Sequence, residues 1–191
     1  VTKFGFIKTG DVGGWIESEK NLSHDDDAWV GGNARVNGDA WVNENAQVEG
    51  NAWVGGNAWI GGNARVKGNA LVGGKAWVGG NAWIGGNARV KGNALVGGKA
   101  WVGGNAWVDG NAKIFSTNHI LIIGPAGSRN DFTTFYMDKD NEITVKCGCF
   151  LGKTDEFLKK VTETHGDNKH AFVYREAVKI AKLQIELCDE K

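Results

Sequence analysis

The chain has 191 residues and carries 22 basic and 22 acidic side chains, so its formal net charge at pH 7 is zero. That length allows one or two domains. The balanced charge excludes the strongly basic footprint of a typical nucleic-acid-binding domain, and no apolar run approaches the ~20 residues of a membrane-spanning helix. Neither a nucleic acid nor a membrane is therefore an expected partner.

Residues 1–27 are predicted to form an N-terminal cap. Trp15-Ile16 and Leu22 lie six residues apart and look like weak copies of the repeat that follows, but two extra residues enter before Val30. A solenoid needs a cover at its end because an open coil exposes unpaired strand edges. The three consecutive aspartates of this segment, at 25–27, are interpreted as a solvated acidic loop.

Residues 28–114 consist of fifteen copies of a six-residue repeat. Each copy has Ala, a variable residue, Val or Ile, two turn residues and usually Asn, as in Ala28-Trp29-Val30. Ala and the aliphatic residue are two apart and face one way, while the residue between them faces the other way, as in a strand. Gly and Asn in the turn tolerate positive φ. So short a strand followed by so short a turn predicts a β-solenoid, in which each hexad forms one side of a coil.

Read from its aliphatic position, as in Ile60-Gly61-Gly62-Asn63-Ala64-Arg65, the repeat resembles the hexapeptide repeat of left-handed parallel β-helices. The resemblance implies three hexads in each triangular coil, and hence about five coils over a length of roughly 24 Å. The predicted fold class is mainly β, a left-handed parallel β-helix with a small C-terminal α+β module.

The Trp side chains of the repeat are predicted to point outward, because the narrow interior accepts only small aliphatic groups. On an 18-residue period, Trp41, Trp59 and Trp77 share one face, and Trp83 and Trp101 share a second. Exposed apolar area of this kind tends to mark a contact surface, although stacking along a parallel ladder can also simply stiffen the coil. These five residues are the candidate interaction surface, either for a protein partner or for self-association, for example as a trimer.

The middle of the repeat contains a perfect duplication. Residues 52–75 and 76–99 are identical and comprise four hexads each. Because four hexads do not divide into three-sided coils, the duplication moves every motif to a different face. A catalytic face would be scrambled by that shift, so a duplicated spacer, natural or engineered, is the preferred interpretation.

Residues 115–191 differ in composition and are predicted to form the α+β module, which also seals the last coil. A turn at 138–141 joins two of its strands into a hairpin. Thr154 is the expected N-cap of a first helix that ends at Gly166. The remaining elements expected here are strands at 119–123, 132–137 and 143–150 and a second helix at about 168–187.

The run Gly124-Pro125-Ala126-Gly127-Ser128-Arg129 is the first candidate for chemistry. Its glycines can turn amide groups toward an anion, and the Ser and Arg side chains add donors. Gly127, Ser128 and Arg129 are therefore candidate residues for a small anionic, nucleotide-like ligand. The run lacks the Lys and the following helix of a P-loop, and a tight connection between strands is the alternative.

His165 and the cysteines are weaker candidates. A cationic His165 suits the C-terminal end of a helix, and a binding or catalytic role there lacks a legible partner. Cys147 and Cys149 have only Cys188 and scattered histidines to complete a metal set, so buried thiols are favoured. No metal and no cofactor are predicted. An odd number of cysteines fits a reducing compartment, and the expected location is the cytoplasm of a bacterium or a phage-infected host.

Enzymes of the hexapeptide-repeat family are mostly trimeric acyltransferases that use a catalytic histidine on the coils or on an extruded loop. The fifteen hexads contain neither a histidine nor such a loop, so the resemblance by itself implies no activity. The strings Gly13-Gly14-Trp15-Ile16 and Thr164-His165-Gly166-Asp167-Asn168 resemble uncharacterised bacterial and prophage members of the family. We therefore expect a non-enzymatic scaffold or interaction protein of phage or prophage origin. The alternatives are a small-molecule-binding protein and an acyltransferase that uses His165.

Overall fold

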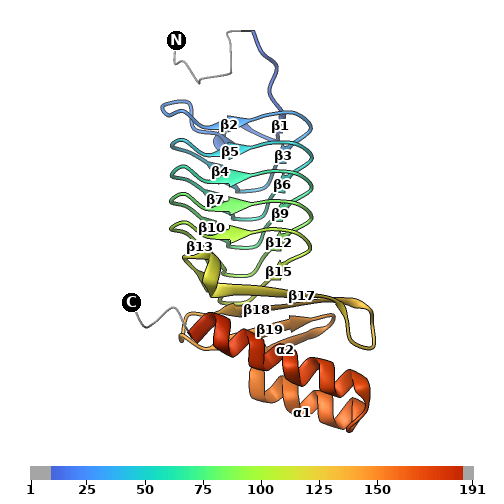
Figure 1. The fold of residues 1–191 in the computed structure, drawn as a ribbon. Helices are drawn as coiled ribbons and strands as arrows, with labels where there is room; N and C mark the ends of the chain where they lie inside the picture. Colours follow the sequence, from blue (N-terminus) through green and yellow to red (C-terminus); the bar gives the residue numbers. More distant parts are fainter. Residues whose placement is uncertain (1–9, 187–191) are drawn as a thin grey trace.

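The computed structural model describes residues 10–186 (Figure 1). The predicted helix end at Leu187 and the third cysteine, Cys188, lie outside the described residues. The chain forms a parallel β-solenoid of about six turns, followed by a small module of antiparallel strands and two helices. The predicted architecture of solenoid and C-terminal α+β module is confirmed.

Three parallel sheets make the sides of the solenoid, and their strand orders are β1-β3-β6-β9-β12-β15, β4-β7-β10-β13-β16 and β2-β5-β8-β11-β14. Paired strands are 18 residues apart in the chain, as in Trp59 opposite Trp77, so three hexads close one coil. The strands are β1 (Trp15–Ile16), β2 (Trp29–Val30), β3 (Arg35–Val36), β4 (Trp41–Val42), β5 (Gln47–Val48), β6 (Trp53–Val54), β7 (Trp59–Ile60), β8 (Arg65–Val66), β9 (Leu71–Val72), β10 (Trp77–Val78), β11 (Trp83–Ile84), β12 (Arg89–Val90), β13 (Leu95–Val96), β14 (Trp101–Val102), β15 (Trp107–Val108) and β16 (Lys113–Ile114).

The interior of the solenoid consists of the Ala and Val or Ile columns of the repeat. Every one of these residues from Ala28 to Ile114 is buried, most of them completely. Each strand is two residues long, with its first side chain outside and its second inside. A narrow interior filled by methyl groups stabilises the coil by the hydrophobic effect and leaves the variable residue of each hexad to the surface.

Glycine at the second turn position of the hexad has a steric cause. Gly62 has a φ of +62°, and a Cβ added to it would lie 2.7 Å from the backbone nitrogen of Gly80, one coil further on. Left-handed backbone conformation and close approach between coils both exclude a side chain. Glu44 is the one non-glycine with positive φ at this position among the described hexads, and its carboxylate accepts a hydrogen bond from the backbone N–H of Gly62.

The sixth turn comes from the residues that precede the regular hexads. Strand β1 pairs in register with β3, and Leu22 forms an isolated parallel bridge with Val42. Between them lies the 3-10 helix η1 (Glu19–Asn21). Its last residue, Asn21, is fully buried, and its side-chain amide donates to the carbonyls of Gly38 and Ala40 at 2.9 and 2.7 Å. This segment thus extends the solenoid as well as covering its first regular coil.

The C-terminal module is a four-stranded antiparallel sheet with two helices. Its elements are the 3-10 helix η2 (Thr117–His119), β17 (Ile120–Ala126), β18 (Asp131–Met137), β19 (Ile143–Cys147), β20 (Phe150–Lys153), α1 (Thr154–His165) and α2 (Lys169–Glu186). The single strand predicted over 143–150 is wrong: Gly148, with a φ of +56°, turns the chain so that β19 and β20 form a hairpin. Thr154 is the first residue of α1 rather than its N-cap, which is Lys153, whereas Gly166 caps the C-terminal end as expected.

The sheet lies between the last coil and the helices (Figure 1). On the solenoid side, Thr134 Oγ1 accepts a hydrogen bond from the backbone N–H of Trp107 at 3.0 Å. The hydroxyl of Tyr136 donates to the carbonyl of Asp109 at 3.0 Å, and burial raises the pKa of this phenol. Phe135 and Val145 face the other way and pack with α1 and α2. The module therefore seals the last coil by hydrogen bonds that replace those of a further strand.

Candidate functional site

The outward positions of the fifteen hexads are occupied mainly by aromatic and basic residues. They comprise eight Trp, three Arg, one Lys, two Leu and one Gln, and none of them is Asp or Glu. The acidic residues of the repeat lie in its turns. The flat sides of the solenoid therefore present indole rings and positive charge together.

The side formed by β8, β11 and β14 carries the most exposed indole pair. Trp83 and Trp101 stack with ring centroids 5.2 Å apart and planes 8° from parallel, and Arg65 lies in register before them. The side chains of Trp83 and Trp101 are 45% and 55% exposed. Strand β14 is the last of its sheet, so no further parallel strand covers the outer face of Trp101. The predicted pairing of these two residues is confirmed, and they form a platform of accessible aromatic surface.

The predicted column of Trp41, Trp59 and Trp77 is also in register, on β4, β7 and β10. Trp59 and Trp77 stack at 4.9 Å, but both are half-buried. The Trp77 ring lies over Gly79, where an added Cβ would be 2.6 Å from a ring carbon. Trp41, at one end of the column, is 45% exposed. The five predicted surface tryptophans thus divide into three exposed ones and two that lie flat on the coil.

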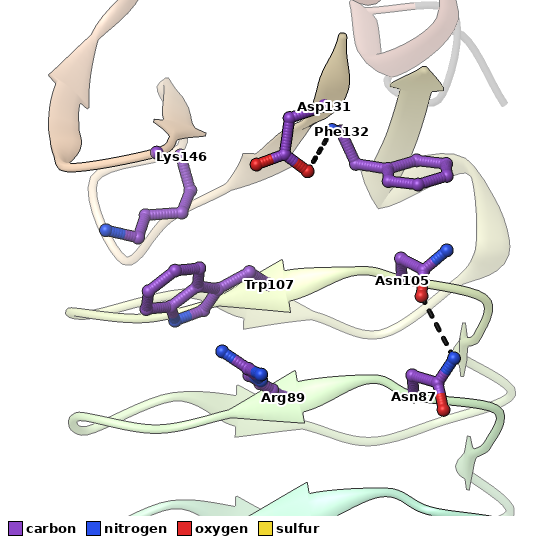
Figure 2. A pocket seen from close by; sticks show the side chains of 8 residues that line it. Asn87, Arg89, Asn105, Trp107, Asp131, Phe132 and Lys146 are labelled. Carbon is purple, nitrogen blue, oxygen red and sulfur yellow. Dashed lines mark hydrogen bonds between the residues drawn. The ribbon is translucent and has the colours of Figure 1, made fainter. Parts of the chain in front are cut away.

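A groove of about 330 Å³ lies at the junction between the last coils and the C-terminal sheet (Figure 2). The indole of Trp107 on β15 is its centre. The guanidinium of Arg89 on β12 lies 5.5 Å from the ring centroid, and the ammonium of Lys146 on β19 lies 4.0 Å from it. Figure 2 shows the two cations on opposite sides of the ring. Each cation is placed to interact with the negative face of the indole.

Lys146 is only 7% exposed. In residues 10–186, neither it nor Arg89 has a hydrogen-bond acceptor or an ion-pair partner, and both contact the Trp107 ring instead. The stem of Lys146 is buried, while its ammonium keeps access to the groove. The groove therefore contains two cations that have no ion-pair partner within residues 10–186.

Polar groups of both signs complete the rim of the groove. Asn105 ends a ladder of side-chain amides in which each Asn donates to the Asn one coil further on, and it accepts from Asn87 at 3.0 Å. Its own amide N–H group has no acceptor among the described residues. Asp131 Oδ1 accepts from the backbone N–H of Phe132 at 2.7 Å, and its other oxygen has no donor within residues 10–186 (Figure 2). The groove thus offers two cations, one free amide donor and one free carboxylate acceptor.

A second pocket, of about 320 Å³, brings together three of the four residues predicted from the tail of the chain. Ser128 and Arg129 follow β17, and His165 ends α1; Ser128 Oγ lies 3.3 Å from His165 Nε2. The imidazole also stacks on Tyr174 with centroids 5.8 Å apart. Lys160 adds a third nitrogen group, and the lining residues include no Asp or Glu.

Gly127 contributes to this pocket indirectly. It has a φ of +70°, and an added Cβ would lie 2.2 Å from the Tyr174 ring. Its role is to let the chain pass over the aromatic ring in the turn between β17 and β18. The segment 124–129 therefore ends β17 and begins the turn to β18, and its last two residues line the pocket.

The sequence reasoning did not find the junction groove. Arg89 and Trp107 were recognisable as neighbours on one side of the solenoid from the 18-residue period. Lys146 gave no such signal, because its position depends on how the C-terminal sheet docks on the last coil. Alternation along β19, with Val145 in the helix-facing core and Lys146 on the opposite side, is the feature that places it.

The architecture defines a β-solenoid protein with a sealed C-terminal end and with aromatic and cationic sides. Residues 12–166 match the family described as "Putative Ice-binding-like adhesive domain", and the chain belongs to that family. No curated protein and no solved structure matches the chain. In the described residues, no helix is long and apolar enough to cross a membrane. Membership of the hexapeptide-repeat superfamily stays a prediction.

Proposed function

We propose that this chain is a non-enzymatic adhesive module that attaches to an extended acidic polysaccharide. The family to which the chain belongs is described as adhesive, and a rigid solenoid with regular sides suits an interaction role. The observation that carries the proposal is the composition of the outward positions, where eight Trp and four cationic residues occur without one acid.

The chemistry of these sides selects the class of partner. Exposed aromatic rings pack against the apolar faces of sugar rings, and Arg or Lys attracts carboxylate or sulfate groups. Trp101 is the most exposed indole of the regular hexads; Arg65 lies on the same side of the solenoid, and Arg89 lies on a neighbouring side. The cations are too few and too widely spaced to track the dense phosphates of a nucleic acid, which many cations must neutralise. An acidic glycan has a lower charge density and fits better.

The proposal is tested by adsorption to immobilised polygalacturonate, with cellulose as the uncharged comparison. We expect the protein to be retained on polygalacturonate and Trp101→Ala to reduce retention several-fold, because the exposed indole is removed. Trp53→Ala, which removes a half-buried indole on another side, is the matched control and should retain binding. Equal retention of the wild type on both polymers would contradict the role of charge. Unchanged retention of Trp101→Ala would contradict the role of the platform.

A second candidate function is the binding of a small nucleotide-like anion by the Ser128, Arg129 and His165 pocket. The observation that favours it is the convergence of these residues with Lys160 over an apolar floor that includes Phe150. Adenosine monophosphate is a suitable probe. It should raise the melting temperature of the wild type, and Arg129→Ala should abolish that increase while Lys139→Ala leaves it intact. An equal increase in Arg129→Ala would remove this candidate.

Two further expectations belong with the proposal. An adhesive module that contacts an external polymer must be exposed at a cell or particle surface, so we prefer that location to the cytoplasm expected from the cysteines. A phage or prophage origin stays a prediction, and it is compatible with a module that attaches to bacterial surface glycans.

A further inference from the structure

We infer that the junction groove around Trp107 is a binding site for a single acidic sugar residue, one that carries a carboxylate or another anionic group on a pyranose ring. The inference deepens the proposed adhesive function, because it names the kind of residue that the solenoid holds at its sealed end. It rests on the groove's own geometry and not on the exposed Trp83 and Trp101 platform.

The charge of Lys146 is unpaired among the described residues. Its side chain is 7% exposed and its ammonium lies 4.0 Å from the Trp107 ring centroid, with no anionic partner in residues 10–186. An indole face is a weaker partner for an ammonium than a carboxylate or a sulfate is. An anion entering the groove would complete the pairing, which makes Lys146 the central anion-binding residue.

The groove also contains a guanidinium, an amide and a carboxylate. Arg89 supplies a planar guanidinium that suits a carboxylate or a sulfate, and it is exposed on the solenoid side of the groove. The free amide of Asn105 and the free carboxylate oxygen of Asp131 supply one donor and one acceptor. Neighbouring hydroxyls of a sugar can bind to one donor and one acceptor at once. The Asp131 carboxylate would instead repel a bare inorganic anion.

The size and access of the groove suit a small ligand. The groove has a volume of about 330 Å³, at the lower end of the range for small-molecule sites, and this suits one sugar ring rather than several. Both faces of Trp107 are already covered by cations (Figure 2), so the sugar is held by charge and hydrogen bonds instead of by stacking. That distinguishes the groove from the Trp101 platform, whose contact is apolar.

Rigidity supports the assignment. Arg89 and Trp107 are paired residues on adjacent coils, and the Trp107 backbone is fixed to the C-terminal sheet through Thr134. Lys146 lies on β19, and it pairs with strands on both sides, opposite Thr134 and Leu151. Groups held on strands in this way lose little freedom on binding, which favours affinity for a small ligand.

Isothermal titration calorimetry with sodium glucuronate, glucose and sodium sulfate tests the inference on the whole chain. We expect glucuronate to bind at least about tenfold more tightly than glucose or sulfate, and Lys146→Met to weaken glucuronate binding at least about tenfold, since a charge-assisted contact is lost. Lys113→Met, which removes an outward lysine away from the groove, is the matched control. Equal binding of glucose would overturn the anionic assignment, equal binding of sulfate would overturn the sugar assignment, and an unaffected Lys146→Met would overturn the site.

Urea unfolding shows whether a loss of binding reflects the site. Lys146→Met keeps an apolar stem of similar length in the buried position and removes only the ammonium and its contact with the Trp107 ring, so the midpoint is expected to change little. If Lys146→Met does not fold, Arg89→Met carries the same test, because Arg89 is exposed. Monosaccharide binding tests the groove, and polymer adsorption tests the Trp101 platform, so the two proposals can be rejected independently. If the wild type is retained on polygalacturonate but does not bind glucuronate, the groove is rejected as a sugar site and the Trp101 platform still stands.

Discussion

At the scale of single residues, the tryptophans show that identical repeat positions do not have identical environments. Trp77 lies flat over Gly79, whereas Trp83, one hexad later, leaves Gly85 open, with its indole nitrogen 3.5 Å from an added Cβ. Trp77 is also held by the stacked ring of Trp59. The first turn glycine of a hexad is consequently a steric requirement in one place and merely permitted in another.

This difference predicts opposite effects of one substitution at two sites. Gly79→Ala places a methyl group 2.6 Å from the Trp77 ring and should lower the free energy of unfolding by about 2 kcal/mol through overpacking. Gly85→Ala meets no such contact and should be neutral or stabilise by up to about 1 kcal/mol, because it restricts the unfolded chain. Urea unfolding of both variants measures the difference. Equal effects would show that the indole position does not determine the requirement for glycine.

Residue-level prediction succeeded where the repeat imposes geometry. The Ala and Val or Ile positions are buried as expected, and the exposed indoles are on the predicted sides. Which tryptophans lie flat was not predictable from a period, because it depends on the neighbouring coil, as with Trp59 and Trp77. Lys146 was missed for the same kind of reason: its environment is made by another segment of the chain.

At the scale of elements, the hairpin between β18 and β19 depends on one buried carboxylate. Asp138 accepts from the Thr144 hydroxyl at 2.6 Å, from the backbone N–H groups of Asp140 and Glu142, and from the ammonium of Lys153. Burial alone would raise the pKa of Asp138, but the hydrogen bonds from Lys153, Thr144 and the backbone outweigh it and lower the pKa. The same network raises the pKa of Lys153, because its ion pairs outweigh the effect of its own burial.

The lowered pKa predicts a pH-dependent contribution to stability. A carboxyl whose folded-state pKa is below its unfolded value of about 3.9 stabilises the fold above that pH and loses this contribution as the pH falls through the folded-state pKa. Asp138→Asn should therefore lower the free energy of unfolding by about 2 kcal/mol at pH 7, with a smaller difference from wild type at pH 3. Thermal melts over this range measure it. A difference that is the same at pH 7 and pH 3 would contradict the role of the charge.

The elements of the C-terminal module were predictable in kind and less so in extent. Hydrophobic alternation indicated the strands, and Gly166 marked the end of α1 correctly. The division of 143–150 into β19 and β20 depends on positive φ at Gly148, which a run of strand-forming residues conceals. Trp15-Ile16 and Leu22 resemble the repeat in the sequence. The turn that they form is closed by the buried side chain of Asn21, whose hydrogen-bond partners are distant in the chain.

At the scale of the whole molecule, the number of residues between two hexads determines whether they lie on the same side of the solenoid. Because three hexads close a coil, deletion of 18 residues preserves every side, whereas deletion of 24 residues rotates the N-terminal part by one side relative to the groove. Deleting 58–75 keeps Trp83 and Trp101 in register with Gln47. Deleting 52–75, one copy of the duplicated block, would instead place Trp41 before them in one column.

The two deletions provide a matched pair that separates folding from surface register. Both deletions join an Asn to Ala76 and keep the hexad pattern unbroken. Both proteins should therefore fold, because each repeat of a solenoid contacts only its neighbours. Glucuronate binding in the junction groove should be preserved in both. The deletion of 52–75 unites the three exposed indoles of Trp41, Trp83 and Trp101, and it should adsorb to polygalacturonate more strongly than the deletion of 58–75. Circular dichroism checks the fold, and retention on the polymer checks the surface. Equal retention of two folded deletions would show that adhesion does not depend on a continuous aromatic column. The contact would then have to be sought at isolated residues such as Trp101. Apart from the alignment of the sides, the two proteins differ only in the hexad 52–57, whose Trp53 is half-buried.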